Sequence, residues 1–184
     1  MKSLIFTAGL ATLMLPLAAA NAAVYSIGGP LSRGCYESAL ARDHGGFALD
    51  GCTRALNEEP LAKADRAATY VNRGIIHMIG GHAQQADADF DQALAINANL
   101  SDAYLNKGFL RIREGKGEEA LPLLQKGIEV GPRRQALAYF ARGVAYEQAG
   151  DYRSAYRDLV RARHMEPSWN LPGEWLAHYQ VRTR

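Results

Sequence analysis

The sequence predicts an all-α protein that is built as a right-handed solenoid of antiparallel helix pairs. The first observation is a repeat, because Gly74, Gly108 and Gly143 stand 34 and 35 residues apart and other columns shift with them. The second observation is that each unit carries two apolar stripes at helical spacing with a glycine between them. One such unit cannot bury its apolar face alone, so we expect stacked copies.

The N-terminal residues have the pattern of an export signal. Lys2 precedes an apolar run from Leu4 to Leu17, and Ala20-Asn21-Ala22 has the spacing that a signal peptidase recognises. The run has about 14 residues, fewer than the roughly 20 that a membrane span needs. We therefore expect residues 1–22 to be a signal peptide that is cleaved near Ala22. The mature protein is then periplasmic or secreted and has no membrane insertion, with a retained anchor as the alternative.

The charge balance points away from two classes of partner. The chain has a formal net charge of +2, which falls to +1 without Lys2. A protein this close to neutrality lacks the basic excess that is typical of nucleic-acid or anionic-lipid binding. We expect no nucleic-acid partner.

Each expected unit has a signal for its turn and its close packing. Glycines fall where the first helix should end, and glycine suits a left-handed C-terminal cap. Small residues in the second helix let the two backbones approach closely, and proline cannot continue a helix. The turn glycines are Gly81, Gly115 and Gly150, the small residues are Ala86, Ala120 and Ala155, and the terminating prolines are Pro132 and Pro167.

These columns resemble the tetratricopeptide repeat family. Three units match, over residues 67–100, 101–135 and 136–169. The match departs from the family where Arg73, Lys107 and Arg142 replace the usual Leu beside the leading glycine. The same period projects a degenerate unit onto residues 34–66, after a flexible segment over residues 23–33. Residues 170–184 are expected to be a C-terminal capping helix in which Trp175 and Tyr179 face inward.

The resemblance implies a disulfide between Cys35 and Cys52. In the projected register the two cysteines occupy columns that pack against each other in the family, and an even number of cysteines in an exported chain favours a bridge. A zinc site with His44 is a weaker alternative because no fourth ligand is evident. A redox pair is also weaker, because the two cysteines lie far apart in sequence.

The sequence shows no arrangement typical of an enzyme. It lacks a nucleophile elbow, a glycine-rich phosphate loop before a lysine, and a His-Glu-x-x-His motif. Asp87, Asp89 and Asp91 stand two residues apart, and residues two apart on a helix point to different sides, so the three cannot all face one substrate or metal. We expect them to form a solvated outer face. We therefore expect no catalytic activity, no metal site and no cofactor.

The resemblance implies a concave face lined by the first helix of each unit. At the repeat positions that line this face, the chain has mostly apolar residues. In the carboxylate clamp known from the family, these positions hold polar residues. Asn72 and Asn106 add amides that can bond to a peptide backbone. The predicted groove residues are Val71, Asn72, Ile75, Met78, Leu105, Asn106, Phe109, Ile112, Arg113, Phe140 and Val144.

The predicted function is protein binding in scaffolding or assembly, with a partner helix or apolar peptide in the groove. One alternative is a carrier of a small apolar ligand or lipid. Another is a self-associating structural protein, a homo-oligomer formed through the same face. The groove residues also have a purely structural interpretation, in which the N-terminal unit, the terminal helix or a second copy packs against them.

Overall fold

The computed structural model describes residues 23–25 and 28–179, and the predicted signal peptide lies outside them. The described residues form helices and no strand, as the repeat pattern predicts. The helices are α1 (Pro30–Ala41), α2 (Gly46–Glu58), α3 (Lys63–Ile79), α4 (Ala83–Ile96), α5 (Ser101–Arg113), α6 (Gly117–Val130), α7 (Gln135–Gln148), α8 (Tyr152–Met165) and α9 (Leu171–Leu176). In this part of the chain, no helix is both long and apolar enough to span a membrane.

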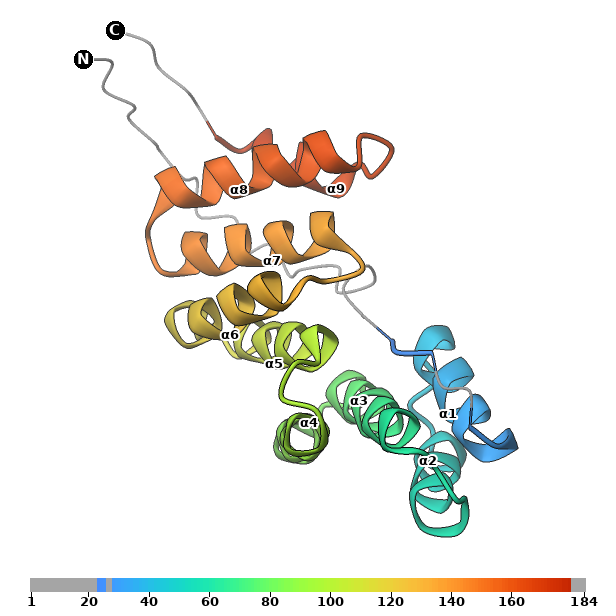
Figure 1. Cartoon of the computed structure of the whole chain (residues 1–184). Coiled ribbons are helices and arrows are strands. Elements are labelled where there is room, and N and C mark those ends of the chain that lie inside the picture. The colour runs from blue at the N-terminus through green and yellow to red at the C-terminus, as the bar shows by residue number, and fades with distance from the viewer. Residues whose placement is uncertain (1–22, 26–27, 180–184) are drawn as a thin grey trace, which may run out of the picture.

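The helices stack in chain order from α1 and α2 at one end to α8 and α9 at the other (Figure 1). Each helix packs against its neighbours in sequence, and α1–α3, α3–α5 and α5–α7 also contact each other. These contacts place the first helices of successive units side by side. The fold is therefore a solenoid of helix pairs of the tetratricopeptide type, with α3, α5 and α7 along the expected concave face.

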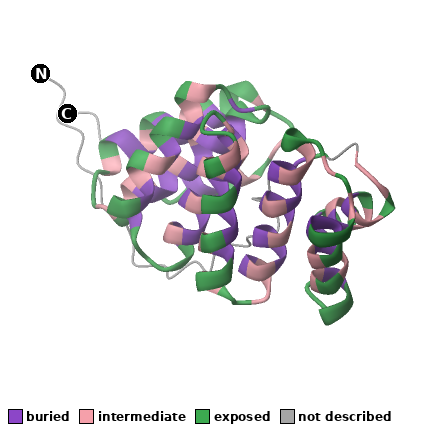
Figure 2. Cartoon of the chain, turned by 60° about the horizontal axis from the view of Figure 1, so that its bottom comes forward, coloured by how far each residue is buried: buried purple, intermediate pink, exposed green. Residues whose placement is uncertain are grey.

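The leading glycines allow the two helices of each unit to pack tightly. A Cβ added to Gly74 would lie 2.6 Å from Cε1 of Phe90, and one added to Gly143 would lie 3.0 Å from Cγ of Leu159. Phe90 and Leu159 are fully buried. Figure 2 shows the buried residues as stripes along the helices that face neighbouring helices. A side chain at either glycine would push the pair apart, so the repeat spacing reflects a packing requirement.

The turns between paired helices also follow the prediction. Gly81, Gly115 and Gly150 have φ values of 81°, 74° and 80°. L-residues with a side chain rarely adopt this left-handed conformation, whereas glycine adopts it at no steric cost. These glycines therefore end α3, α5 and α7 and reverse the chain toward the second helix.

The helix α6 runs through Pro122 from Gly117 to Val130. Proline in a helix interior removes one backbone hydrogen bond, and Gly127 weakens the same helix. Gly127 is buried, and an added Cβ would meet Cδ2 of Leu105 at 2.8 Å. The close approach of α5 explains a glycine at this position.

The N-terminal unit begins earlier than predicted. Residues 23–33 were expected to be flexible, but α1 starts at Pro30. The carboxylate of Glu59 accepts hydrogen bonds from the backbone N–H groups of Leu31 and Ser32, at 2.7 and 3.0 Å. Proline suits the first turn of a helix, and a carboxylate at the N-terminus of a helix interacts favourably with the helix dipole. Those contacts fix the start of α1 within the segment that was expected to be flexible.

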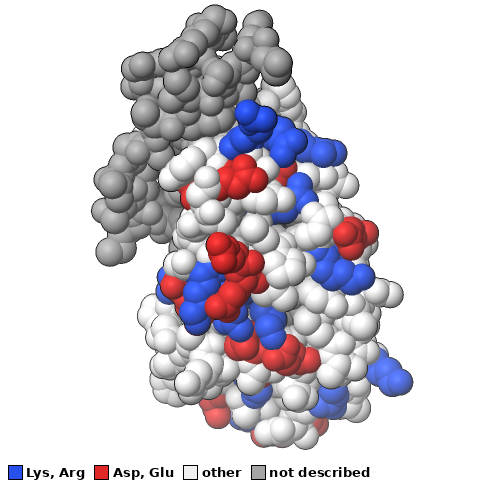
Figure 3. Space-filling view, turned by 90° about the vertical axis from the view of Figure 1, so that its left-hand side faces the viewer, with Lys and Arg blue, Asp and Glu red and all other residues white. Residues whose placement is uncertain are grey.

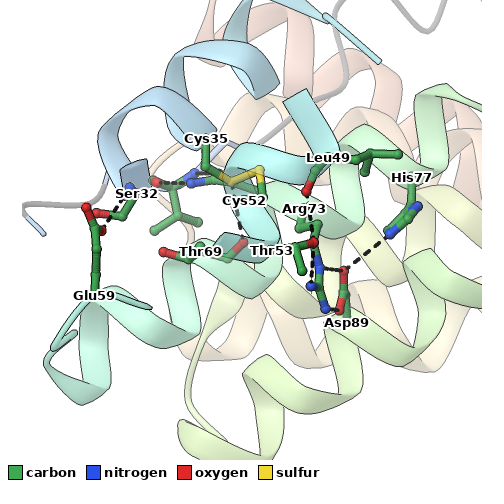
Figure 4. The surroundings of a disulfide bond; sticks show 12 residues. Ser32, Cys35, Leu49, Cys52, Thr53, Glu59, Thr69, Arg73, His77 and Asp89 are labelled. Atoms are coloured by element: carbon green, nitrogen blue, oxygen red, sulfur yellow. Dashed lines mark hydrogen bonds and ion pairs between the residues drawn. A yellow bond between two sulfur atoms is a disulfide. The ribbon is translucent and has the colours of Figure 1, made fainter. Parts of the chain in front are cut away.

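The predicted disulfide is confirmed. Cys35 on α1 and Cys52 on α2 are bonded, with their Cα atoms 4.8 Å apart, and both residues are buried (Figure 4). Because both sulfur atoms are in the disulfide, the alternative zinc site with His44 has lost its thiolate ligands. The bridge connects the two helices of the unit with the fewest large apolar residues.

The C-terminal helix is shorter than predicted. A helix over residues 170–184 was expected, but α9 ends at Leu176, and residues 180–184 lie outside the described part. The N–H groups of His178 and Tyr179 donate to the carbonyl groups of Trp175 and Leu176, three residues earlier. This tighter turn directs Tyr179 toward α7, where its hydroxyl is bound.

Candidate functional site

The predicted groove residues lie on the first helices, as expected, but almost all are buried. The set occupies α3, α5 and α7, which are consecutive along one side of the solenoid. Every member except Arg113 is at most 4 % exposed, whereas Arg113 is exposed. The groove is therefore not an open apolar channel in this structure, and the binding role of these residues stays a prediction.

Leu105 belongs to the packing between α5 and α6. Its Cδ2 lies where a Cβ on Gly127 would come within 2.8 Å, so its side chain contacts the second helix of its own unit. Leu105 is 1 % exposed. Leu105 therefore stabilises the fold by packing α5 against α6.

The C-terminal end of the face is covered by the capping segment. Phe140 on α7 makes edge-on ring contacts with Trp169 and Trp175, with centroids 5.1 and 5.6 Å away. Trp175 Nε1 and Tyr179 Oη both donate to Oε2 of Glu147, at 2.8 and 2.5 Å. Burial, then the bond to Glu147, raises the pKa of Tyr179. The prediction that Trp175 and Tyr179 face inward is confirmed.

At the other end of the face, Asn72 binds the backbone of the N-terminal segment. Its Oδ1 accepts from the N–H of Val24 at 2.9 Å, and its Nδ2 donates to the carbonyl of Val24 at 2.8 Å. Asn72 is fully buried and Val24 is 8 % exposed. One side-chain amide thus satisfies both polar groups of one residue in a segment that is neither helix nor turn.

Asn106 occupies the equivalent position one repeat later. Its Nδ2 donates to the carbonyl of Asp102 within α5, at 2.8 Å. Asp102 is half-buried, and burial raises the pKa of its carboxyl group against the opposing effect of Arg133. This face therefore carries one buried asparagine near the middle of each of α3 and α5.

The expectation that the three aspartates of α4 form a solvated outer face is wrong for Asp89, which is buried, whereas Asp91 is exposed and Asp87 is partly exposed. Asp89 is 4 % exposed, and its two oxygens accept from Nε and Nη2 of Arg73 at 2.9 and 2.7 Å (Figure 4). Asp87 accepts from Arg111 at 2.8 Å, and Asp91 pairs with Lys107. Asp87 and Asp91, one helical turn apart, both pair with Lys107, whereas Asp89 points to Arg73, so the three carboxylates do not converge on one group.

The basic residues that depart from the family pattern are the partners of these and similar aspartates. Arg142 forms the same bidentate pair with Asp158, at 2.7 and 3.0 Å. Hydrogen bonding to the carboxylate raises the pKa of both Arg73 and Arg142. Figure 3 shows acidic and basic side chains adjoining in small clusters on one face instead of a field of one sign.

The sequence could have revealed two of these pairs. In the first and third units, the basic residue before the leading glycine is followed by an aspartate 16 residues later: Arg73 by Asp89 and Arg142 by Asp158. That spacing equals the one between Gly74 and Phe90, which also pack together. A basic residue and an aspartate at the same spacing in two units indicate a contact between paired helices.

A histidine pair lies at the turn between α3 and α4. Nδ1 of His77 is 3.5 Å from Nδ1 of His82, and Nε2 of His77 is 4.0 Å from Oδ2 of Asp89. Burial lowers the pKa of His77, against the opposing effect of Asp89. Among the described residues, no group of three or more His, Cys, Asp or Glu side chains is arranged to hold a metal ion.

Comparisons with known proteins support the class of tetratricopeptide-type repeat proteins. No family model matches the chain. The chain is 31 % identical over 64 residues to human tetratricopeptide repeat protein 6, covering 35 % of this chain and 12 % of that protein. It is 32 % identical over 92 residues to the bovine protein SGT1 homolog, covering 50 % of this chain and 26 % of that protein. The chain thus spans about a quarter or less of the curated relatives that it matches.

Solved structures agree in fold over most of the chain. A crystal structure of MamA has a TM-score of 0.59 at 24 % identity, covering 75 % of this chain and 77 % of that chain. MamA from residue 41 to its end, from Desulfovibrio magneticus RS-1, has a TM-score of 0.63 at 20 % identity and covers 78 % and 80 %. At these identities the likeness is one of fold.

Proposed function

We propose that this protein is a non-catalytic interaction module that binds an extended, largely apolar peptide segment of another protein on its concave face. The observation that carries this proposal is the pairing of Asn72 with both backbone groups of Val24. A side-chain amide bonded in this way can bind any residue except proline in an extended segment, because every non-proline residue offers the same backbone donor and acceptor. The apolar residues around Asn72 supply the remaining affinity.

The tetratricopeptide-type relatives support a role in protein binding, and scaffolding or assembly is the role we propose. The alternative of a lipid carrier is less favourable on chemical grounds. An acyl chain has neither donor nor acceptor, so it would leave the buried amide of Asn72 without hydrogen bonds when the N-terminal segment moves away. Leaving a buried polar group unsatisfied costs about 1–3 kcal/mol.

We also propose that the protein works in the periplasm or outside the cell, after cleavage near Ala22. The N-terminal sequence supports export, and the Cys35–Cys52 disulfide is of the kind that persists in oxidising compartments. Pulse labelling of the expressed protein, followed by mass measurement of the exported form, tests the cleavage site. Retention of Lys2 in the exported form would contradict it.

Site-specific photo-crosslinking in intact cells tests the binding face. A photoreactive residue at Arg113, the exposed member of the predicted groove, should capture a partner, whereas one at Lys126, exposed on α6, should not. Mass spectrometry then identifies the crosslinked segment, which is synthesised and titrated against purified protein. Equal capture from both positions, or captured segments that do not bind in isolation, would contradict the proposal.

A further inference from the structure

The N-terminal segment occupies a site that has the chemistry of a peptide-binding subsite. Both hydrogen bonds between Asn72 and Val24 connect groups 48 residues apart, so the contact does not result from chain proximity. Ala23 and Val24 pack against the hydrophobic core, while the next residue, Tyr25, is 48 % exposed. Alternation of a buried and an exposed side chain is what an extended segment presents when it lies on an apolar surface.

The subsite is built so that it needs an occupant. Asn72 is 0 % exposed, and both ends of its amide bond to Val24. If residues 23–25 moved away, the amide of Asn72 would lose both hydrogen bonds unless water or another peptide backbone took their place. Another peptide backbone satisfies both, whereas an apolar ligand satisfies neither.

Few hydrogen bonds hold the occupant. Its described hydrogen bonds to the helical body are the two with Asn72, and Tyr25 adds an edge-on contact with Tyr36 at a centroid distance of 5.3 Å. By contrast, α1 is connected to α2 by a disulfide and capped by Glu59. The segment can therefore leave while the first helix pair stays in place.

We propose that residues 23–25 are a displaceable internal occupant of the Asn72 subsite, and that an extended peptide with a small β-branched residue at the position of Val24 replaces them. This inference rests on the proposed function, since the incoming peptide belongs to the bound partner. The internal segment lowers the apparent affinity for that partner by the fraction of molecules in which the subsite is free.

The test uses a fluorescent hexapeptide with the sequence of residues 23–28, Ala-Val-Tyr-Ser-Ile-Gly, titrated into purified protein and followed by anisotropy. Val24→Asp places a charge in the buried position and should release the internal segment. Tyr25→Asp introduces the same charge at the exposed neighbour and serves as the matched control. Val24→Pro removes the N–H donor without adding charge, so it keeps the test valid if Val24→Asp folds poorly.

The hexapeptide should bind Val24→Asp and Val24→Pro at least about tenfold more tightly than it binds the wild type or Tyr25→Asp. Adding Asn72→Ala to Val24→Pro should remove the gain. Equal affinity for Val24→Pro and wild type, or a gain that survives Asn72→Ala, would overturn the proposal. Hydrogen exchange of the Val24 amide gives a readout without ligand: its exchange should be slow in the wild type and faster in Asn72→Ala.

The two proposals can fail separately. A partner peptide that binds the wild type and Val24→Pro equally well would overturn displacement and leave the interaction module intact. Failure to capture any partner from Arg113, combined with tight hexapeptide binding to Val24→Pro, would contradict the module and leave the subsite intact.

Discussion

Gly108 on α5 lies so close to Leu124 on α6 that a Cβ at Gly108 would be 2.6 Å from Cδ2 of Leu124. Leu124 is fully buried and cannot move aside without disturbing its neighbours. The same contact recurs between Gly74 and Phe90 and, less tightly, at Gly143 and Leu159. Close helix packing within each unit therefore depends on one glycine.

The first prediction follows from this contact. Gly108→Ala should destabilise the protein by about 1–3 kcal/mol, because the methyl group overpacks a rigid site. Gly51→Ala is the control: it lies within α2 with nothing within 4 Å of its added Cβ, so it should stabilise by about 0.5–1 kcal/mol. Urea unfolding measures both, and two changes of the same sign would refute the packing argument.

The second prediction concerns the disulfide. Replacing Cys35 and Cys52 with Ser should cost roughly 3 kcal/mol in the chain-entropy model, for a loop of sequence separation 17. The loss should be local, because a solenoid transmits contacts mainly between neighbours. Hydrogen exchange should therefore speed up in α1 and α2 more than in α7 and α8. Uniform acceleration along the chain would show that the N-terminal unit supports the whole array.

The third prediction compares two ion pairs of α4. Asp89→Asn should cost about 3–5 kcal/mol, because it leaves the guanidinium of Arg73 without its partner in a largely buried site. Asp91→Asn should cost about 0–1 kcal/mol, since the side chain of Asp91 is 56 % exposed. A double-mutant cycle with Arg73→Met and Asp89→Leu isolates the coupling. Similar losses for Asp89→Asn and Asp91→Asn would mean that burial does not control these pairs.

The repeat pattern predicted much of the fold, and its failures have identifiable physical causes. The glycine columns fixed the helix pairs and the left-handed turns, since both depend on local backbone sterics. The pairing of Asn72 with Val24 left no sequence signal, because any residue except proline supplies the same backbone groups. The sequence left open whether the predicted groove residues are buried, because whether a concave face is open depends on where distant segments of the chain pack.

The fourth prediction concerns pH. Burial lowers the pKa of His77 below its ordinary 6.5, so the folded protein takes up this proton less readily than the unfolded chain. The stability that His77 contributes is complete above pH 6.5 and is lost as the pH falls toward its folded pKa. His77→Gln should remove part of this acid-side slope, whereas His164→Gln, exposed on α8, should not. NMR titration of the His77 ring checks the direction, and a folded pKa above 6.5 would contradict it.

The fifth prediction separates stability from binding on α5. Phe109 is 4 % exposed, so Phe109→Glu should destabilise by at least about 3 kcal/mol, as a charge replaces a buried ring. Arg113→Glu, one turn later and exposed, should leave the melting temperature close to wild type. If Phe109→Glu has the melting temperature of the wild type and loses partner binding, the ring of Phe109 contacts the partner and is not a core residue.

The carboxylate of Glu147 has a consequence for how such an array can lengthen. Trp175 and Tyr179 both bond to it, and Trp175 also packs on Phe140, so the surface that a further helix pair would need is already occupied. A unit duplicated after α8 would have to displace these aromatic residues, whereas a unit duplicated between α4 and α5 would meet only the interfaces that the other units already share. Growth by internal duplication would therefore leave this closure intact, whereas growth by terminal addition would require the closure to be displaced.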